Sequence, residues 1–141
     1  MVSDSKIEAL SRVPLFARCG RKELEFLAGQ ADEVEVEAGR KLIEQGRPGD
    51  TFFVLLEGEA EVEVDGRPRP PLHAGDFFGE ISMLDRGPAS ATVVTRTPAK
   101  LMVMGHLQFR DAIRASDPLL AAVLAAAAER LRRDALSRNP A

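Results

Sequence analysis

The sequence predicts a mainly β fold with helical ends (α+β): an eight-stranded β-roll or jelly-roll barrel with an N-terminal helix pair and C-terminal helices. Three observations lead to this prediction. Apolar residues repeat at helical spacing at both ends of the chain, they alternate along short runs in the middle, and glycine stands at most turns between those runs.

The N-terminal part of the chain, about residues 3–30, is predicted to form the helix pair. Ile7 and Leu10 fall on one face of the first helix, which Pro14 ends because the residue before a proline avoids helical backbone. The second helix is expected over residues 21–29, where leucines repeat at helical spacing and a glycine marks the end.

Short strands are predicted over about residues 31–105, the β-roll segment. Residues 33–37 alternate strictly between glutamate and valine, the pattern of a strand with one buried face. Asp65-Gly66, between two strand-like runs, predicts a hairpin, and three prolines restrict residues 67–71 to an edge strand or a loop. The other strand-like runs are 41–45, 51–56, 60–64, 91–95 and 99–104.

The C-terminal part, about residues 106–137, returns to a helical period and is predicted to form one or two amphipathic helices. Asp117-Pro118 is a helix-start signal inside it. No repeat or linker divides the chain, so residues 1–141 are expected to form a single domain. The two ends of the sequence are compatible with a complete short protein, and a chain that ends at Ala141 is not expected to carry a helix-turn-helix after its last helix.

Bulk composition argues against several classes of partner. A net charge of −3 and a pI near 5.5 give no electrostatic reason to expect nucleic acid. No apolar run approaches the roughly 20 residues that span a bilayer, and the polar residues 1–11 do not resemble a signal peptide. The single cysteine, Cys19, is expected to pack as a small apolar residue, and it fits a cytoplasmic protein.

Catalytic and metal sites are not expected. No serine stands in a nucleophile-elbow context, and His73 and His106 are far apart and lack neighbouring metal ligands. The glutamates of the predicted strands are spaced as solvated strand faces rather than as a catalytic pair. The sequence therefore predicts neither an enzyme nor a resident cofactor.

The most informative stretch is residues 75–93, which reads Gly-Asp-Phe-Phe-Gly-Glu-Ile-Ser-Met-Leu, a short loop, and Pro-Ala-Ser-Ala-Thr-Val. It resembles the phosphate-binding cassette of cyclic-nucleotide-binding domains, in which Phe-Gly-Glu and an apolar half-turn precede a loop and Pro-Arg-(Ala/Ser/Thr)-Ala-Thr-Val. Residues 13–16 with 23–24, and residues 57–62, resemble the helical start and central strands of that family. The resemblance covers roughly residues 6–135 and implies a single-domain, bacterial-type member with a degenerate cassette.

The same residues indicate a ligand site on physical grounds. Gly79 allows close approach because it has no Cβ, and residues 80–84 can form one helical turn with free N–H groups at its start. Glu80 only accepts hydrogen bonds when ionised, which suits a ribose hydroxyl donor. The alternative is that Glu80 merely caps the helical turn.

The resemblance implies a role for each matching residue. Glu80 would bind the ribose 2′-hydroxyl, and the amides around Gly79 would hold the ribose or the phosphate. Ser90 and Ala91 would flank the phosphate. The implied ligand-binding residues are Phe78, Gly79, Glu80, Ile81, Ser82, Ala89, Ser90, Ala91 and Thr92.

Ala89 departs from the family pattern, since it stands where the family has a phosphate-pairing arginine. A bidentate guanidinium–phosphate contact is among the stronger polar contacts. Its loss is expected to weaken cyclic nucleotide binding by about 2–4 kcal/mol. Arg86, three residues earlier in the loop, either swings in to replace it or is simply solvated.

Two functions remain open. The first is a non-enzymatic regulatory module that binds a cyclic nucleotide weakly (cAMP rather than cGMP, or a related anionic small molecule) and relays binding through its C-terminal helix. The second is a ligand-independent protein–protein interaction module with a vestigial pocket. Leu124, Ala127 and Leu131 form either the lid face of that helix or a homodimer contact, and a further protein partner is expected. Arg130–Arg133 is interpreted as a solvated helix end.

Overall fold

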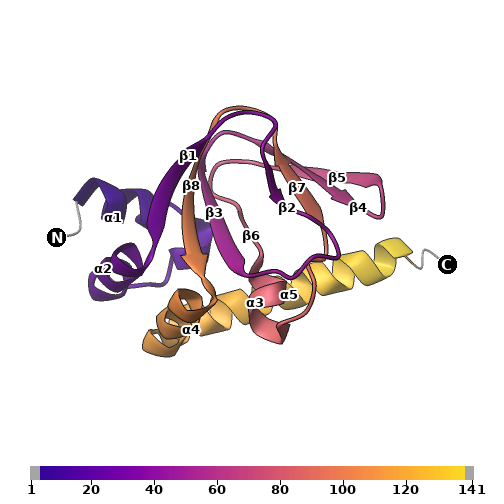
Figure 1. The fold of residues 1–141 in the computed structure, drawn as a ribbon. Helices are drawn as coiled ribbons and strands as arrows, with labels where there is room; N and C mark the ends of the chain where they lie inside the picture. The colour runs from indigo at the N-terminus through magenta and orange to yellow at the C-terminus, as the bar shows by residue number, and fades with distance from the viewer. Residues whose placement is uncertain (1–3, 139–141) are drawn as a thin grey trace.

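The structure is a computed structural model that describes residues 4–138. Within them eight strands form two four-stranded antiparallel sheets, ordered β1-β8-β3-β6 and β2-β7-β4-β5 (Figure 1). The strands are β1 (Asp32–Val36), β2 (Lys41–Ile43), β3 (Thr51–Glu57), β4 (Ala60–Val64), β5 (Arg67–Leu72), β6 (Phe77–Phe78), β7 (Thr92–Thr95) and β8 (Ala99–Gly105). The predicted mainly β fold with helical ends is confirmed.

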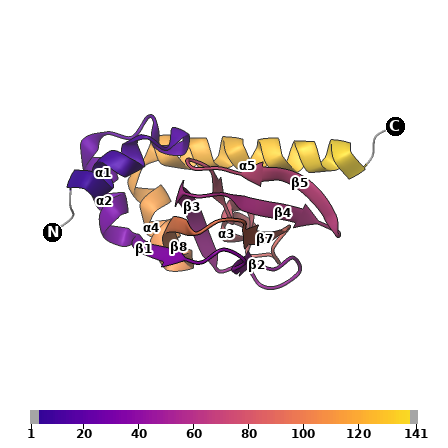
Figure 2. The same cartoon turned by 90° about the horizontal axis from the view of Figure 1, so that it is seen from above.

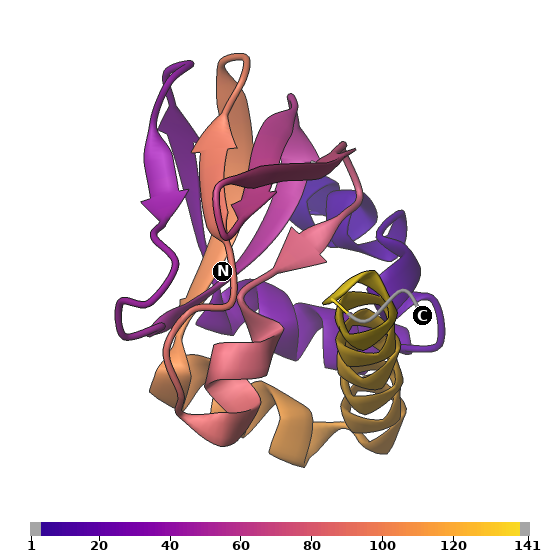
Figure 3. The same ribbon diagram turned by 90° about the vertical axis from the view of Figure 1, so that its right-hand side faces the viewer.

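Helices stand at both ends of the chain and once between strands. They are α1 (Asp4–Ser11), the 3-10 turn η1 (Pro14–Phe16), α2 (Arg21–Gln30), α3 (Glu80–Asp85), α4 (His106–Ala115) and α5 (Asp117–Arg138). α5 contacts both η1 and α3. Figures 1 and 3 show α5 passing α3. Seen from above, α5 extends along one side of the roll (Figure 2).

The strand β3 is buried on both faces, which explains its unbroken apolar run. Phe52 and Val54 join the core between the roll and the helices, and Phe52 packs edge-on against Phe109 of α4. Phe53 and Leu55 point the other way, into the core between the two sheets. Alternate side chains of one strand therefore build two separate cores.

Other strands expose one face, as their alternation predicts. In β4 Ala60 and Val64 are buried, while Glu61 and Glu63 are exposed. The strand β5 lies at the edge of its sheet, which accommodates its prolines because an edge strand can leave N–H positions unpaired.

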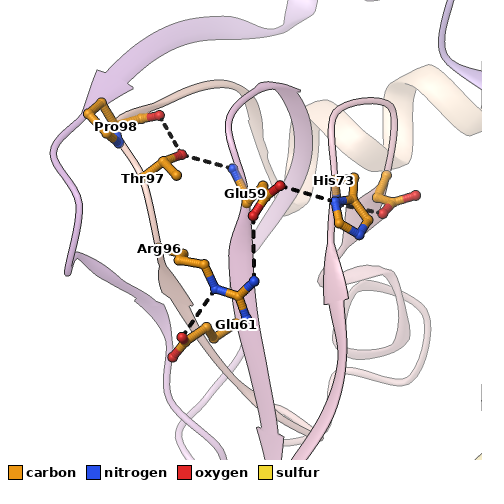
Figure 4. Close-up of polar contacts among 7 residues, drawn as sticks. Glu59, Glu61, His73, Arg96, Thr97 and Pro98 are labelled. Atoms are coloured by element: carbon orange, nitrogen blue, oxygen red, sulfur yellow. Dashed lines mark hydrogen bonds and ion pairs between the residues drawn. The ribbon is translucent and has the colours of Figure 1, made fainter.

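A polar cluster lies at the start of β4 (Figure 4). Arg96 bridges Glu61 at 3.2 Å and Glu59 at 3.5 Å, and His73 lies 3.7 Å from Glu59. The Glu59 N–H donates to the Thr97 hydroxyl at 3.0 Å. These contacts fasten the β7–β8 turn to β4 and confirm a solvated strand face.

Two short elements, β6 and η1, were not expected, and β2 is shorter than predicted. β6 has only two residues, paired with Phe53 and Val54, so it is too short for an alternation pattern to reveal. β2 ends at Ile43 because the Gln45 N–H donates to the Thr92 hydroxyl instead of continuing the backbone ladder.

Cys19 is half-buried against the helical core, as its expected apolar role requires. Burial, with a smaller contribution from the charge of Glu23, raises the pKa of its thiol.

Among residues 4–138, no group of three or more His, Cys, Asp or Glu side chains is placed to hold a metal ion. Over the same range, no helix is both long and apolar enough to cross a membrane.

Candidate ligand-binding site

A cavity of about 780 Å³ opens between the β2-β7-β4-β5 sheet, α3 and α5. Its volume is within the usual range for a small-molecule site. Eight of the nine residues implied by the cassette resemblance line it, namely Phe78, Gly79, Glu80, Ile81, Ser82, Ala89, Ser90 and Ala91. The fold therefore brings both ends of the predicted cassette to one cavity.

Thr92 is the one predicted residue outside this lining. Its hydroxyl accepts a hydrogen bond from the Gln45 N–H at 3.0 Å. Thr92 thus holds the segment after β2 against β7, which is a structural contact rather than a contact with the cavity.

Two glycines allow the cavity wall to close tightly around α3. Gly79 has φ +91°, and a Cβ there would clash with the Thr51 carbonyl oxygen of β3. A Cβ on Gly49 would clash with the Ser82 side chain. The loop between β2 and β3 and the start of α3 are therefore in direct contact.

Glu80 is the most deeply buried charged residue of the site, at 1% exposure. Its Oε1 accepts a hydrogen bond from Arg130 Nη1 at 2.5 Å, and its Oε2 is buried without a hydrogen-bond partner. The carboxylate does not bond to helix N–H groups, so the alternative in which Glu80 caps α3 is wrong. An unpaired buried carboxylate oxygen is costly, and a hydroxyl donor in the cavity would satisfy it.

Arg130 joins α5 to this site. Besides its bond to Glu80, its Nη2 donates to the Phe77 carbonyl, and its guanidinium lies 4.7 Å from the centre of the Phe77 ring. The interpretation of residues 130–133 as a solvated helix end is therefore wrong for Arg130, whose side chain is only 26% exposed. Glu80 and Arg130 are 50 positions apart, so no local pattern revealed the pair.

Of the two alternatives for Leu124, Ala127 and Leu131, a shared lid face over the cavity is not what the structure shows. Ala127 is buried at 5% exposure, whereas Leu124 and Leu131 are 49% and 53% exposed. None of the three lines the cavity, which α5 reaches through Arg130 and Arg133 instead.

The cassette end of the cavity lacks the family arginine, and Arg86 does not replace it here. Ala89 is 7% exposed and lines the cavity. Arg86 is exposed, stands in a left-handed conformation at the end of α3 and is not part of the lining. Cationic side chains reach the cavity from other elements: Lys41, Arg47, Arg69, Arg130 and Arg133.

The sheet side of the cavity is largely apolar. Ile43 and Val93 are cross-strand neighbours, and Val93 is in turn the neighbour of Val62. Arg69 continues this row on β5, opposite Val62. Cross-strand neighbours share a face of the sheet, so the row presents an apolar surface ending in a cation to the cavity.

Comparisons with known proteins agree with this arrangement. The family model for the cyclic nucleotide-binding domain matches residues 33–116. A cAMP-dependent protein kinase regulatory subunit from Aspergillus fumigatus is 38% identical over 104 residues, which is 72% of this chain and 25% of that relative. The chain therefore spans about a quarter of the length of this curated relative.

Solved structures show the same fold. The catabolite activator protein of Thermus thermophilus has a TM-score of 0.80 at 24% identity, covering 89% of this chain and 62% of that chain. The N-terminal domain of a transcriptional regulator from Streptomyces coelicolor A3(2) has a TM-score of 0.70 at 31% identity, covering 89% of this chain and 94% of that chain.

The β-roll and its cassette-lined cavity are those of a regulatory ligand-binding domain. The chain belongs to the cyclic nucleotide-binding domain family.

Proposed function

We propose that this domain binds a cyclic nucleotide, with cAMP preferred over cGMP, and that the nucleotide is a regulatory ligand rather than a resident cofactor. The observation that carries the proposal is the buried Glu80 Oε2, which lacks a partner inside a cavity lined by eight cassette residues. A ribose hydroxyl is a donor of the required kind. The cAMP preference is supported by the similar relatives, which are cAMP-dependent protein kinase regulatory subunits.

Binding is proposed to be weak because Ala89 removes from the cassette itself the guanidinium that the family places there. The relay is proposed to run through Arg130, the side chain that touches both Glu80 and the Phe77 carbonyl. A ligand hydroxyl that donates to Glu80 Oε2 changes the electrostatic potential at the carboxylate that holds α5 through Arg130. Ligand occupancy and the position of α5 would thereby be coupled through one ion pair.

Isothermal titration with cAMP and cGMP tests the proposed function. We expect saturable binding of cAMP in the micromolar to millimolar range and weaker binding of cGMP. If millimolar concentrations of both nucleotides gave neither heat in the titration nor chemical-shift changes in NMR spectra of the protein, the proposal would be excluded for these ligands.

Replacement of Arg130 by glutamine tests the relay. The variant leaves the buried Glu80 carboxylate without its cation, so we expect a loss of about 2 kcal/mol in the free energy of unfolding. Hydrogen exchange of the α5 amides should become faster, and it should no longer respond to cAMP.

The matched control for this variant is Arg132→Gln, which removes the same charge from an exposed position of α5 outside the cavity lining. Its exchange should respond to cAMP as in the wild type. If Arg130→Gln retained the wild-type response, the relay would have to use another contact.

A ligand-independent interaction module is the second candidate. It is favoured by Ala89 and by the exposed Leu124 and Leu131, which lie seven positions apart on one side of α5 and offer a contact to a second copy or another protein. Sedimentation velocity combined with the titration separates the two candidates: a stable dimer that binds neither nucleotide would favour the interaction module.

We further propose that the protein is cytoplasmic, which its single cysteine supports.

A further inference from the structure

The loop between β2 and β3 is hydrogen-bonded to the cassette at the position of Ala89. The Ala89 N–H donates to the Arg47 carbonyl at 2.8 Å, and the Gly46 N–H donates to the Ala89 carbonyl at 3.0 Å. One residue further along, Pro48 and Pro88 form an antiparallel bridge. Gly46 and Arg47 therefore both lie opposite Ala89 in an irregular pairing, because the Arg47 N–H donates to the Glu44 carbonyl at 3.1 Å and not to Ala89.

This pairing places the Arg47 side chain close to where a side chain at position 89 would reach. Directly opposed residues of an antiparallel pair have Cβ atoms roughly 5 Å apart and on the same face. Both Arg47 and Ala89 line the cavity.

The Arg47 guanidinium is held only loosely in this conformation. Its Nε lies 3.3 Å from Glu44, and the two side chains are 76% and 46% exposed. Lys41 also lies 3.6 Å from Glu44, so the carboxylate keeps a cation if Arg47 leaves. Exposed pairs of this kind contribute about 0–1 kcal/mol, so reorientation of Arg47 costs little.

The other arginines of the cavity lie on other elements. Arg130 bonds Glu80 and the Phe77 carbonyl. Arg69 lies on β5, at the edge of the sheet opposite β2, and Arg133 lies on α5. Arg47 is the arginine of the described lining whose backbone carbonyl accepts a hydrogen bond from the Ala89 N–H of the cassette.

We propose that Arg47 is the phosphate-binding arginine of this domain, and that it replaces from the neighbouring loop the guanidinium that Ala89 lacks. This inference rests on the proposed cyclic nucleotide function. A planar guanidinium can donate two parallel hydrogen bonds to phosphate oxygens, and it can do so from either of two neighbouring backbone positions. When the phosphate binds, Arg47 turns from Glu44 into the cavity.

The test compares Arg47→Gln with the wild type in calorimetric titrations of cAMP and of adenosine, which lacks the phosphate. We expect Arg47→Gln to weaken cAMP binding by about tenfold and to leave the adenosine response unchanged. Glu44→Gln should strengthen cAMP binding when Arg47 is present. Arg18→Gln is the matched control, because it removes the same charge from an exposed position outside the cavity lining.

The outcomes separate this inference from the function on which it rests. If Arg47→Gln binds cAMP like the wild type while Glu80→Ala loses binding, the inference is overturned and the proposed function stands. A loss with Arg86→Gln instead of Arg47→Gln would likewise assign the phosphate to the cassette loop and overturn it. If neither the wild type nor Ala89→Arg binds cAMP, both the inference and the proposed function fail.

Discussion

Replacing Glu80 by alanine is expected to abolish measurable cAMP binding, with a loss of about 30-fold to 150-fold in affinity. The variant removes a buried acceptor that the structure leaves without a partner, and a ligand hydroxyl held by a carboxylate contributes about 2–3 kcal/mol. The measurement is a calorimetric titration of the wild type and the variant. Because the change also frees Arg130, a thermal unfolding curve of each protein must accompany it.

A second ligand, 2′-deoxy-cAMP, tests whether Glu80 binds the ribose 2′-hydroxyl. We expect the wild type to bind 2′-deoxy-cAMP much more weakly than cAMP, because that analogue lacks the hydroxyl that Oε2 would accept from. Glu80→Gln, which preserves the shape of the side chain, should fold like the wild type and discriminate less between the two ligands. If the wild type bound both equally, Glu80 would have a structural role through Arg130 and would not be the ribose ligand.

Much of the fold could be predicted from the sequence because its strands carry periodic signals. The alternation in residues 33–37 set the position of β1 to within one residue, and the prolines of residues 67–71 indicated the edge strand β5. The cassette motif placed a short helix after Gly79, as observed for α3. These are local effects, in which each residue type constrains its own backbone and its nearest neighbours.

The contacts of the candidate site were harder to predict because they join distant segments. The pair between Glu80 and Arg130 depends on where α5 passes α3, and the bond from Gln45 to Thr92 depends on how β2 meets β7. The orientation of α5 likewise decided that Ala127 faces inward while Leu124 faces outward. A helical period gives the width of an apolar face but not the partner against which it packs.

Replacing Ala89 by arginine is expected to strengthen cAMP binding by about 2–4 kcal/mol, roughly 30-fold to 1000-fold. Ala89 lines the cavity and is buried, so the new guanidinium would enter the site rather than solvent. Without ligand, a half-buried charge lacking a partner should lower the melting temperature. Saturating cAMP should raise that temperature by more than it does for the wild type, since the ligand stabilises only the folded state.

The size of this gain depends on whether Arg47 already serves the phosphate. If it does, Ala89→Arg adds a second cation to a site that has one, and the gain in the wild-type background lies near 30-fold. In the Arg47→Gln background the same substitution restores the missing contact, so its gain should be larger. Equal gains in the two backgrounds would show that positions 47 and 89 act independently. No gain in either background would show that position 89 does not face the phosphate, and that the match of this residue to the family arginine is wrong.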